Sequence, residues 1–234
     1  MRSRSIHLSD VHKSFGEGTT RVHALRGMSL EVPAGQMCAI MGPSGSGKST
    51  VLHLAAGLLS PDAGTVRLGD RLVSTMSSDE LSVLRRREIG IVFQFFNLLP
   101  YLTAEENVAL PLRLDGVGAA EERDRVQRSL ELVQMTHRRA HQATDLSGGE
   151  MQRVAIARAL AISPSVILAD EPTGNLDSVN GRQIIELLRD INEQVHVTTL
   201  VVTHDPVWGS FCDRIVRMSD GQVTEDISLN SNAA

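Results

Sequence analysis

One short segment of the chain has the spacing of a loop that binds phosphate groups. Residues 42–49 read Gly-Pro-Ser-Gly-Ser-Gly-Lys-Ser, which fits G-x-x-x-x-G-K-[ST] at every fixed position. Glycines let backbone N–H groups turn toward phosphates, Lys48 places a cation on the β- and γ-phosphates, and the Ser49 hydroxyl can bind Mg²⁺. The predicted phosphate-binding residues are Gly42, Pro43, Ser44, Gly45, Ser46, Gly47, Lys48, Ser49 and the following Thr50.

Two adjacent carboxylates follow a fully apolar run of the chain. Asp170 and Glu171 come directly after residues 166–169, which read as a buried strand. In open α/β sheets the ligand crevice lies at the carboxyl ends of the strands, beside the phosphate loop. We therefore expect Asp170 to bind Mg²⁺ and Glu171 to orient or deprotonate the attacking water. The alternative is a solvated helix start before Pro172.

Two further polar residues follow predicted core strands. His204 comes after residues 198–203 and is a candidate contact for the γ-phosphate, whereas Gln94 comes after residues 89–93 and can touch Mg²⁺ or the water. A single residue at a strand end can also be structural or merely exposed. The predicted catalytic residues are Glu171, His204, Gln94 and Lys48, and the predicted metal ligands are Ser49, Gln94 and Asp170.

A second anion site is predicted far along the chain. Residues 146–150 read Leu-Ser-Gly-Gly-Glu and precede a strong helical segment, residues 151–162. Ser147 can cap that helix, and Gly148 and Gly149 expose backbone N–H groups at its positive end. An ordinary capped helix start would look the same.

The elements that must position these residues alternate between strands and helices. Residues 37–41, 166–169 and 198–203 read as buried strands, and residues 49–59, 121–135 and 179–191 have helical spacing. Val126, Leu130 and Val133 form the apolar stripe of the second helix. Hairpins are expected at residues 64–73, turning at Gly69-Asp70, and at residues 215–224. Hydrophobic residues make up 41% of the 234 residues and aromatics only 3%, which suits a parallel sheet covered by helices.

Composition excludes several classes of protein. The net charge of −5 and the absence of a basic stripe argue against nucleic-acid binding, and the run Arg85-Arg86-Arg87 is interpreted as a solvated helix face. Cys38 is interpreted as a small buried hydrophobe. No stretch approaches the roughly 20 apolar residues that a membrane span needs, so we expect a cytoplasmic chain without direct membrane insertion.

Taken together, these motifs resemble the nucleotide-binding subunit of ABC transporters over residues 5–225. The phosphate loop, Gln94, residues 146–150, residues 166–171, Asp177 and His204 occur in that family's order, and Leu-Ser-Gly-Gly-Glu is highly specific to it. The resemblance implies an α/β P-loop NTPase core with a mostly parallel sheet, an N-terminal antiparallel β subdomain and an inserted α-helical subdomain. The expected boundaries are a catalytic lobe at about 1–94 and 163–225, a helical lobe at about 95–162, and a polar, disordered tail at 226–234.

The same resemblance implies roles for residues outside the phosphate loop. Gln94 resembles a glutamine that senses the γ-phosphate and faces the membrane partner, and residues 174–177 resemble a loop that links two ATP sites. Phe15 aligns with the aromatic that stacks on adenine, where the family usually has tyrosine, and Met151 replaces a commoner glutamine. The implied nucleotide-binding residues are Phe15, Ser147, Gly148, Gly149, Glu150 and Asp177, and the implied cofactors are ATP and Mg²⁺.

If one chain supplies the phosphate loop and another supplies Ser147, the active form is a head-to-tail homodimer, closed by ATP and opened by hydrolysis. Residues 93–100 and 102–108, like residues 169–177, are similar to the lipoprotein-releasing and macrolide-exporting group. That similarity implies an export-type permease partner and a place on the inner face of the cell membrane. Phe95, Phe96, Leu98 and Leu99 can receive that partner or fill the helical core.

Two other functions are compatible with the family. Cell-division members act as regulatory switches that transmit ATP state to an envelope hydrolase without moving a substrate. A soluble chromosome-maintenance or DNA-repair ATPase is disfavoured by the acidic charge and by the absence of a long heptad insertion.

Overall fold

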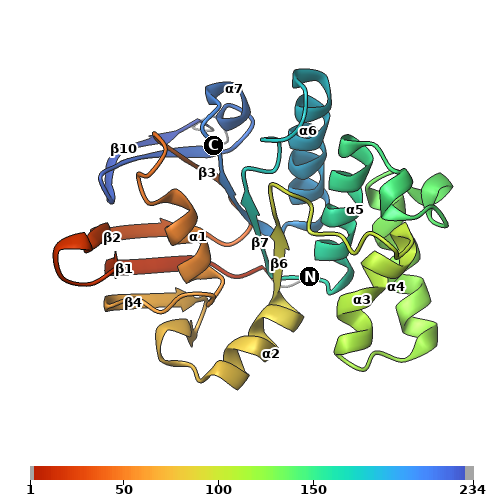
Figure 1. Cartoon of the computed structure of the whole chain (residues 1–234), viewed down its shortest axis with the longest axis horizontal. Helices are drawn as coiled ribbons and strands as arrows, with labels where there is room; N and C mark the ends of the chain where they lie inside the picture. The colour runs from red at the N-terminus through yellow and green to blue at the C-terminus, as the bar shows by residue number, and fades with distance from the viewer. Residues whose placement is uncertain (1–2, 230–234) are drawn as a thin grey trace, which may run out of the picture.

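Two β-sheets of different kinds organise the fold, which the computed structural model describes for residues 3–229 (Figure 1). The larger sheet has the strand order β10-β9-β3-β8-β7-β6, and only its β9–β10 pair is antiparallel. Its strands are β3 (Met37–Met41), β6 (Ile89–Val92), β7 (Val166–Asp170), β8 (Thr198–Val202), β9 (Arg214–Ser219) and β10 (Gln222–Ser228). The predicted mostly parallel sheet is confirmed.

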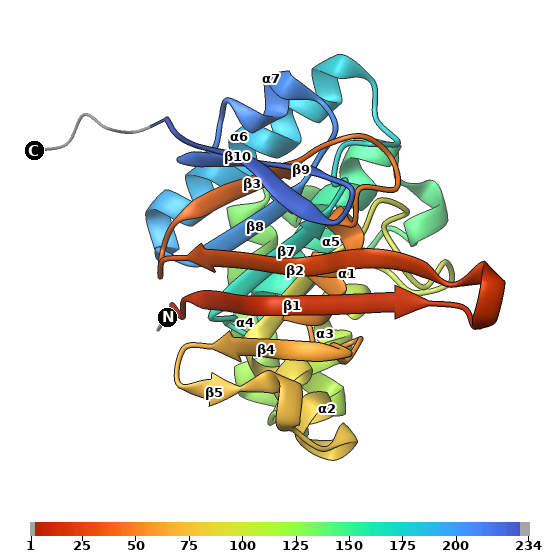
Figure 2. The ribbon, with the colours of Figure 1, turned by 90° about the vertical axis from the view of Figure 1, so that its left-hand side faces the viewer.

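The smaller sheet is antiparallel and comes from the N-terminal part of the chain, with the order β2-β1-β4-β5. It is seen face-on in Figure 2. Its strands are β1 (Ile6–Phe15), β2 (Val22–Val32), β4 (Ala63–Leu68) and β5 (Arg71–Leu72). The hairpin predicted around Gly69-Asp70 is therefore the β4–β5 pair.

Seven α-helices accompany the sheets in the described part of the chain. They are α1 (Lys48–Ala55), α2 (Ser78–Glu88), α3 (Ala104–Leu114), α4 (Ala119–Leu132), α5 (Gly148–Ala161), α6 (Ser178–Val195) and α7 (Pro206–Gly209). The same part of the chain has four 3-10 turns, at Gly18–Thr20, Val73–Thr75, Thr136–Arg138 and Ala143–Asp145. No helix within residues 3–229 has both the length and the apolar character needed to cross a membrane.

Strand β3 is buried on both faces, as its unbroken apolar sequence predicts. Met37, Ala39 and Met41 face a core shared with α5 and α6. Cys38 and Ile40 face a second core that includes α1 and the antiparallel sheet. Helix α1 thus packs between the two sheets, and this packing fixes the position of the end of the phosphate loop, Lys48 and Ser49.

Helices α3, α4 and α5 form a separate group beyond β6, on the right of Figure 1. The predicted stripe of Val126, Leu130 and Val133 is fully buried in this group. The three helices are inserted in the sequence between β6 and β7. The segment that leads to Ser147 is part of this insertion.

One local prediction is wrong and another is incomplete. β10 continues to Ser228, and Arg214 bonds to Asp226 through both carboxylate oxygens, so residues 226–228 are not disordered. The remainder of the predicted tail, residues 230–234, lies outside the described residues. The basic run on α2 is also not simply solvated, because Arg86 and Arg87 both pair with Asp115 at the end of α3.

Candidate nucleotide-binding and catalytic site

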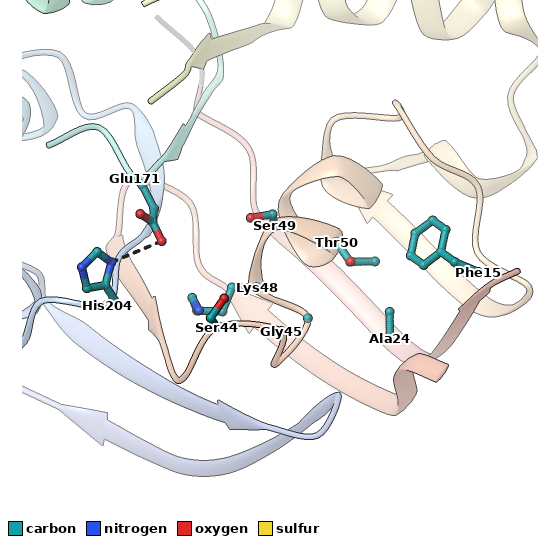
Figure 3. Close-up of a pocket in the computed structure, with 10 residues that line it drawn as sticks. Phe15, Ala24, Ser44, Gly45, Lys48, Ser49, Thr50, Glu171 and His204 are labelled. Carbon is teal, nitrogen blue, oxygen red and sulfur yellow. Dashed lines mark ion pairs between the residues drawn. The ribbon is translucent and has the colours of Figure 1, made fainter. Parts of the chain in front are cut away.

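A cavity of about 630 Å³ opens where α1 leaves the phosphate loop (Figure 3). Glu171 and His204 lie at one end of it, and Phe15 lies at the other. The lining residues are Phe15, Ala24, Ser44, Gly45, Gly47, Lys48, Ser49, Thr50, Glu171 and His204. The structure thus brings together four features that the sequence analysis had selected separately: Phe15, the phosphate loop, Glu171 and His204.

The phosphate loop connects β3 to α1, as the motif requires. At two of its positions, only glycine fits, because backbone atoms of neighbouring strands lie too close for a side chain. Gly47 caps α1 with φ 99°, and a Cβ on it would lie 2.5 Å from the Ala24 carbonyl oxygen. A Cβ on Gly42 would lie 2.1 Å from the carbonyl oxygen of Met218. Side chains are excluded at both positions, so the loop backbone lies against its neighbouring strands.

Lys48 is buried under this loop and donates hydrogen bonds of 2.8 Å to the carbonyl oxygens of Gly42 and Pro43. Its ammonium therefore has a fixed position at the N-terminus of α1, where the helix dipole also favours an anion.

Asp170 ends β7 and accepts a 3.0 Å hydrogen bond from the Ser49 hydroxyl. Burial raises the pKa of its carboxyl, and the Ser49 hydrogen bond opposes that rise. Among the ion pairs of residues 3–229, none involves Asp170. A half-buried carboxylate that forms no ion pair, next to a hydroxyl, is an oxygen donor set that suits Mg²⁺.

Glu171 and His204 form a pair across two neighbouring strand ends. The Glu171 carboxylate lies 3.3 Å from His204 Nδ1, while the backbone N–H of Glu171 donates to the Val202 carbonyl. Glu171 has a φ of 44°, which is uncommon for a residue with a side chain. The surrounding hydrogen bonds hold this strained backbone, which turns the carboxylate into the cavity.

Gln94 follows β6 but does not line the cavity. Its side chain lies against Gly174, where an added Cβ would approach Gln94 Nε2 to 2.7 Å. Its backbone carbonyl accepts a 2.9 Å hydrogen bond from Asn175. The structure therefore places Gln94 beside residues 174–177, and its contact with metal or water stays a prediction.

The segment around Ser147 caps α5 and lies apart from the cavity lining. The Ser147 hydroxyl oxygen accepts from the Glu150 N–H at 3.3 Å, and the Glu150 carboxylate accepts from the Ser147 N–H at 2.9 Å. The latter bond lowers the pKa of Glu150. Gly149 packs against Asn180 of α6, and Gly148 against Leu176. The predicted helix cap is present, and its role toward nucleotide stays a prediction.

Asp177 also has a structural task within its own chain. Its carboxylate accepts hydrogen bonds from the N–H groups of Val179 and Asn180, at 2.9 and 3.0 Å, and so caps α6. These bonds, that from Asn180 above all, lower its pKa. Any contact between Asp177 and nucleotide has to coexist with this cap.

Two residues of the site were missed by the sequence analysis. Ala24 lines the cavity beside Phe15, and only the pairing of β1 with β2 brings it there. Gln152 is fully buried and donates to the Pro172 carbonyl at 2.7 Å, which ties α5 to the residue after Glu171. The sequence feature that could have revealed Gln152 is its position as a polar residue on the otherwise apolar buried face of α5.

A phosphate loop between a buried parallel strand and a helix, with carboxylates at the end of a neighbouring strand, defines a P-loop nucleoside triphosphatase. Helix α5 and its glycine-rich start are an addition to that core.

Comparisons with known proteins narrow this class. A profile described as ABC transporter matches residues 25–174. The chain is 43% identical to the lipoprotein-releasing system ATP-binding protein LolD of Bacteroides thetaiotaomicron, covering 94% of this chain and all of that protein. It is 44% identical to the macrolide export ATP-binding/permease protein MacB of Bdellovibrio bacteriovorus, covering 97% of this chain but 34% of that protein. The chain thus spans about a third of the length of its macrolide-export relatives.

Solved structures agree. The dimeric structure of MJ0796, a bacterial ABC transporter cassette, superposes with a TM-score of 0.88 at 42% identity, covering 97% of this chain and 99% of the other. The same cassette in a dimeric post-hydrolysis state with ADP and Pi superposes with the same TM-score. The chain belongs to the ABC transporter family, and its fold is that of an ATP-binding cassette.

Proposed function

We propose that the chain is the ATP-binding and ATP-hydrolysing subunit of an ABC transporter and that it powers a separate membrane permease. The observation that carries the proposal is the single cavity that joins the phosphate loop, the Glu171–His204 pair and Phe15. Triphosphate fits along the loop from Lys48 to Thr50, and the base reaches Phe15. Relatives named for lipoprotein release and macrolide export support an export or release type of partner.

Mg²⁺ fits the donors supplied by Ser49 and Asp170, which already lie 3.0 Å apart. When bound, the ion neutralises charge on the β- and γ-phosphates. Gln94 is proposed to complete the ligand set. The Gln94 side chain contacts Gly174, so a movement of this side chain would displace residues 174–177 directly.

Glu171 is proposed to orient the attacking water and accept its proton, since a general base must lie within hydrogen-bond reach of the water. The exposed His204 ring, 3.3 Å away, holds the carboxylate in place and contacts the γ-phosphate. Lys48 stabilises the charge that develops on the transferred phosphoryl group.

The working form is proposed to be a head-to-tail homodimer. Ser147, Gly148, Gly149, Glu150 and Asp177 lie outside the cavity lining, and in a two-fold dimer they complete the site of the partner subunit. The relative whose dimer was solved with ADP and Pi is consistent with this arrangement.

The permease is proposed to dock beside the segment after β6. Phe95 is 71% exposed and Tyr101 is 84% exposed, whereas Leu98 packs against the helical core. Leu98 thus fills the helical core, as one of the two interpretations expects, and docking of a partner on the exposed part stays a proposal. Such a partner places the chain on the inner face of the cell membrane. The regulatory-switch alternative gains no support, because the relatives found are named for release and export.

The variant Glu171→Gln tests the proposal. We expect it to bind ATP as the wild type does, to lose turnover at least about a hundredfold, the usual contribution of a general base, and to accumulate an ATP-bound dimer on gel filtration. Glu193→Gln, which changes an exposed glutamate on α6, is the matched control. Normal steady-state hydrolysis by Glu171→Gln would contradict the role given to Glu171.

A further inference from the structure

The end of the cavity that is proposed to receive the nucleotide base carries no charged lining residue and has Thr50 as its nearest polar side chain. Phe15 and Ala24 line it, while the charged side chains Lys48 and Glu171 lie toward the other end (Figure 3). A base at this end is therefore held chiefly by the face of the Phe15 ring. The position and electron density of that ring decide how tightly the base stacks.

Lys13 lies over this ring. Its ammonium nitrogen is 5.7 Å from the centre of the Phe15 ring, within the range of a cation–π contact. Lys13 and Phe15 are two residues apart on β1, next to a register shift in its pairing with β2. Phe15 lines the cavity and Lys13 does not, as expected if the ring lies between the ammonium and the space for the base.

The ammonium is held firmly in this place. The Lys13 side chain is only 16% exposed, and its nitrogen donates to the Ser60 carbonyl at 2.8 Å and to Asp62 at 3.0 Å. The second carboxylate oxygen of Asp62 accepts from the Ser14 N–H at 2.7 Å. The hydrogen bond from Lys13 also lowers the pKa of Asp62, which favours the ionised carboxylate.

Lysine is rare in this protein. The 23 basic residues include only two lysines, Lys48 in the phosphate loop and Lys13 behind the aromatic ring. One therefore lines the proposed nucleotide cavity, and the other contacts the aromatic ring at its end. The scarcity also makes each of them individually observable by spectroscopy.

We propose that Lys13 is a positioning residue for nucleotide binding, which fixes the Phe15 ring from behind and withdraws electron density from it. A cation on one face of the ring leaves the opposite face open and makes it a better partner for an electron-rich purine. The inference rests on the proposed function, because it assumes that the base stacks on Phe15.

The variant Lys13→Met keeps the length of the side chain and removes its charge. We expect Mg-ADP to bind about three- to tenfold more weakly, the size that a cation–π contact allows. The KM for ATP should rise by a similar factor while kcat at saturating ATP stays the same. Lys13→Arg, which retains a cation over the ring, should restore most of the affinity.

A double-mutant cycle with Phe15→Leu separates this role from a general effect of charge or folding. In the Phe15→Leu background, Lys13→Met should cause little further loss of Mg-ADP affinity, because the ring through which it acts is gone. Equal losses in both backgrounds would overturn the proposal, as would unchanged affinity of Lys13→Met in the wild-type background. Thermal unfolding of each variant shows whether it is folded.

A second measurement needs no variant at Lys13. In protein labelled with ¹³C-lysine, the Hε signals of Lys13 should be shifted upfield by the ring, lose that shift in Phe15→Leu, and move when Mg-ADP binds. Unshifted Hε signals would overturn the proposal. If Phe15→Leu and Lys48→Ala both bind Mg-ADP normally, the nucleotide site itself is wrong. If they lose affinity and Lys13→Met does not, only the role of Lys13 is wrong.

Discussion

Asp170 combines the requirements of a buried strand with those of a metal site. It ends β7, whose other residues, 166–169, are fully buried. Burial raises its pKa above the ordinary value of 3.8, and the hydrogen bond from Ser49 does not reverse the rise. In the folded protein without nucleotide, the ionised form of this carboxylate is therefore less stable, relative to the protonated form, than in the unfolded chain.

Replacing this carboxylate should stabilise the protein and abolish its function. The raised pKa means that stability falls as the pH rises from 3.8 through the folded-state pKa, and the penalty persists at neutral pH. We expect Asp170→Asn to raise the melting temperature of the nucleotide-free protein by about 2–4 °C at pH 7, since relief of such strain is worth about 1 kcal/mol. Mg-dependent hydrolysis should disappear.

Thermal unfolding at pH 7 and at acid pH checks this expectation, because the gain should vanish once both folded and unfolded carboxyls are protonated. Asp190→Asn, at an exposed position on α6, is the control and should change little. A loss of stability in Asp170→Asn at neutral pH would show that the Ser49 hydrogen bond outweighs the burial of the carboxylate.

The residues that the sequence could predict are those whose neighbours along the chain reveal them. Residues 42–50 form a motif by themselves, and Asp170 and His204 directly follow apolar strands. Lys13 and Ala24 carry no such signal, because their relation to the site exists only after β1 and β2 pair and β1 brings Phe15 to the cavity. Residues that act through tertiary contact escape a local pattern.

At the scale of elements, buried strands were predicted better than exposed ones. Strands β7 and β8 are runs of buried apolar and β-branched residues apart from Asp170 at the end of β7, whereas β1 extends over ten residues although only its first part alternates clearly. Register shifts along β1 break the alternation that a sequence pattern depends on. Helix α3 was not predicted individually, although Thr103 and Glu106 form a capping box, because Pro111 interrupts its pattern.

The β9–β10 hairpin offers a test at this scale. Arg214 bonds to both oxygens of Asp226 and donates to the Glu31 carbonyl at 2.6 Å, so it links the hairpin to β2 of the other sheet. The hydrogen bond from Arg214 lowers the pKa of Asp226 below 3.8. The stability of this pair is therefore present above pH 3.8 and is lost as the pH falls through the lowered pKa.

We expect Asp226→Asn to cost about 1 kcal/mol of unfolding free energy at pH 7, since bonds to charged groups are strong but this carboxylate is partly exposed. Glu225→Gln is the matched control, because its pair with Arg217 is exposed on both sides and should be worth less than about 0.5 kcal/mol. Urea unfolding measures both. Equal costs, or a cost for Asp226→Asn that does not shrink with falling pH, would contradict the assignment.

At the scale of the whole molecule, the proposed nucleotide site is divided between two separate places on the chain. The cavity holds the phosphate loop and the Glu171–His204 pair, while the capped start of α5 lies outside the cavity lining. Within the chain, the two are connected through Gln152, which bonds to the carbonyl after Glu171. If a second copy places its Ser147 at the cavity of the first, the position of that Ser147 is therefore linked, through Gln152, to Glu171 of the second copy.

This coupling predicts that Ser147 matters for assembly and not for the first binding of ATP. In the Glu171→Gln background we expect Ser147→Arg to bind ATP as a monomer with unchanged affinity but to form no dimer, because a bulky cation on this surface prevents closure over the partner's triphosphate.

Ser82→Arg, on exposed α2, keeps the same added charge away from that surface and should dimerise normally. Sedimentation with and without ATP distinguishes the variants, and hydrolysis by the wild type should fall more steeply than protein concentration on dilution. A Ser147→Arg variant that dimerises as readily as the control, or a wild type whose rate per chain is independent of dilution, would show that each chain completes its own site.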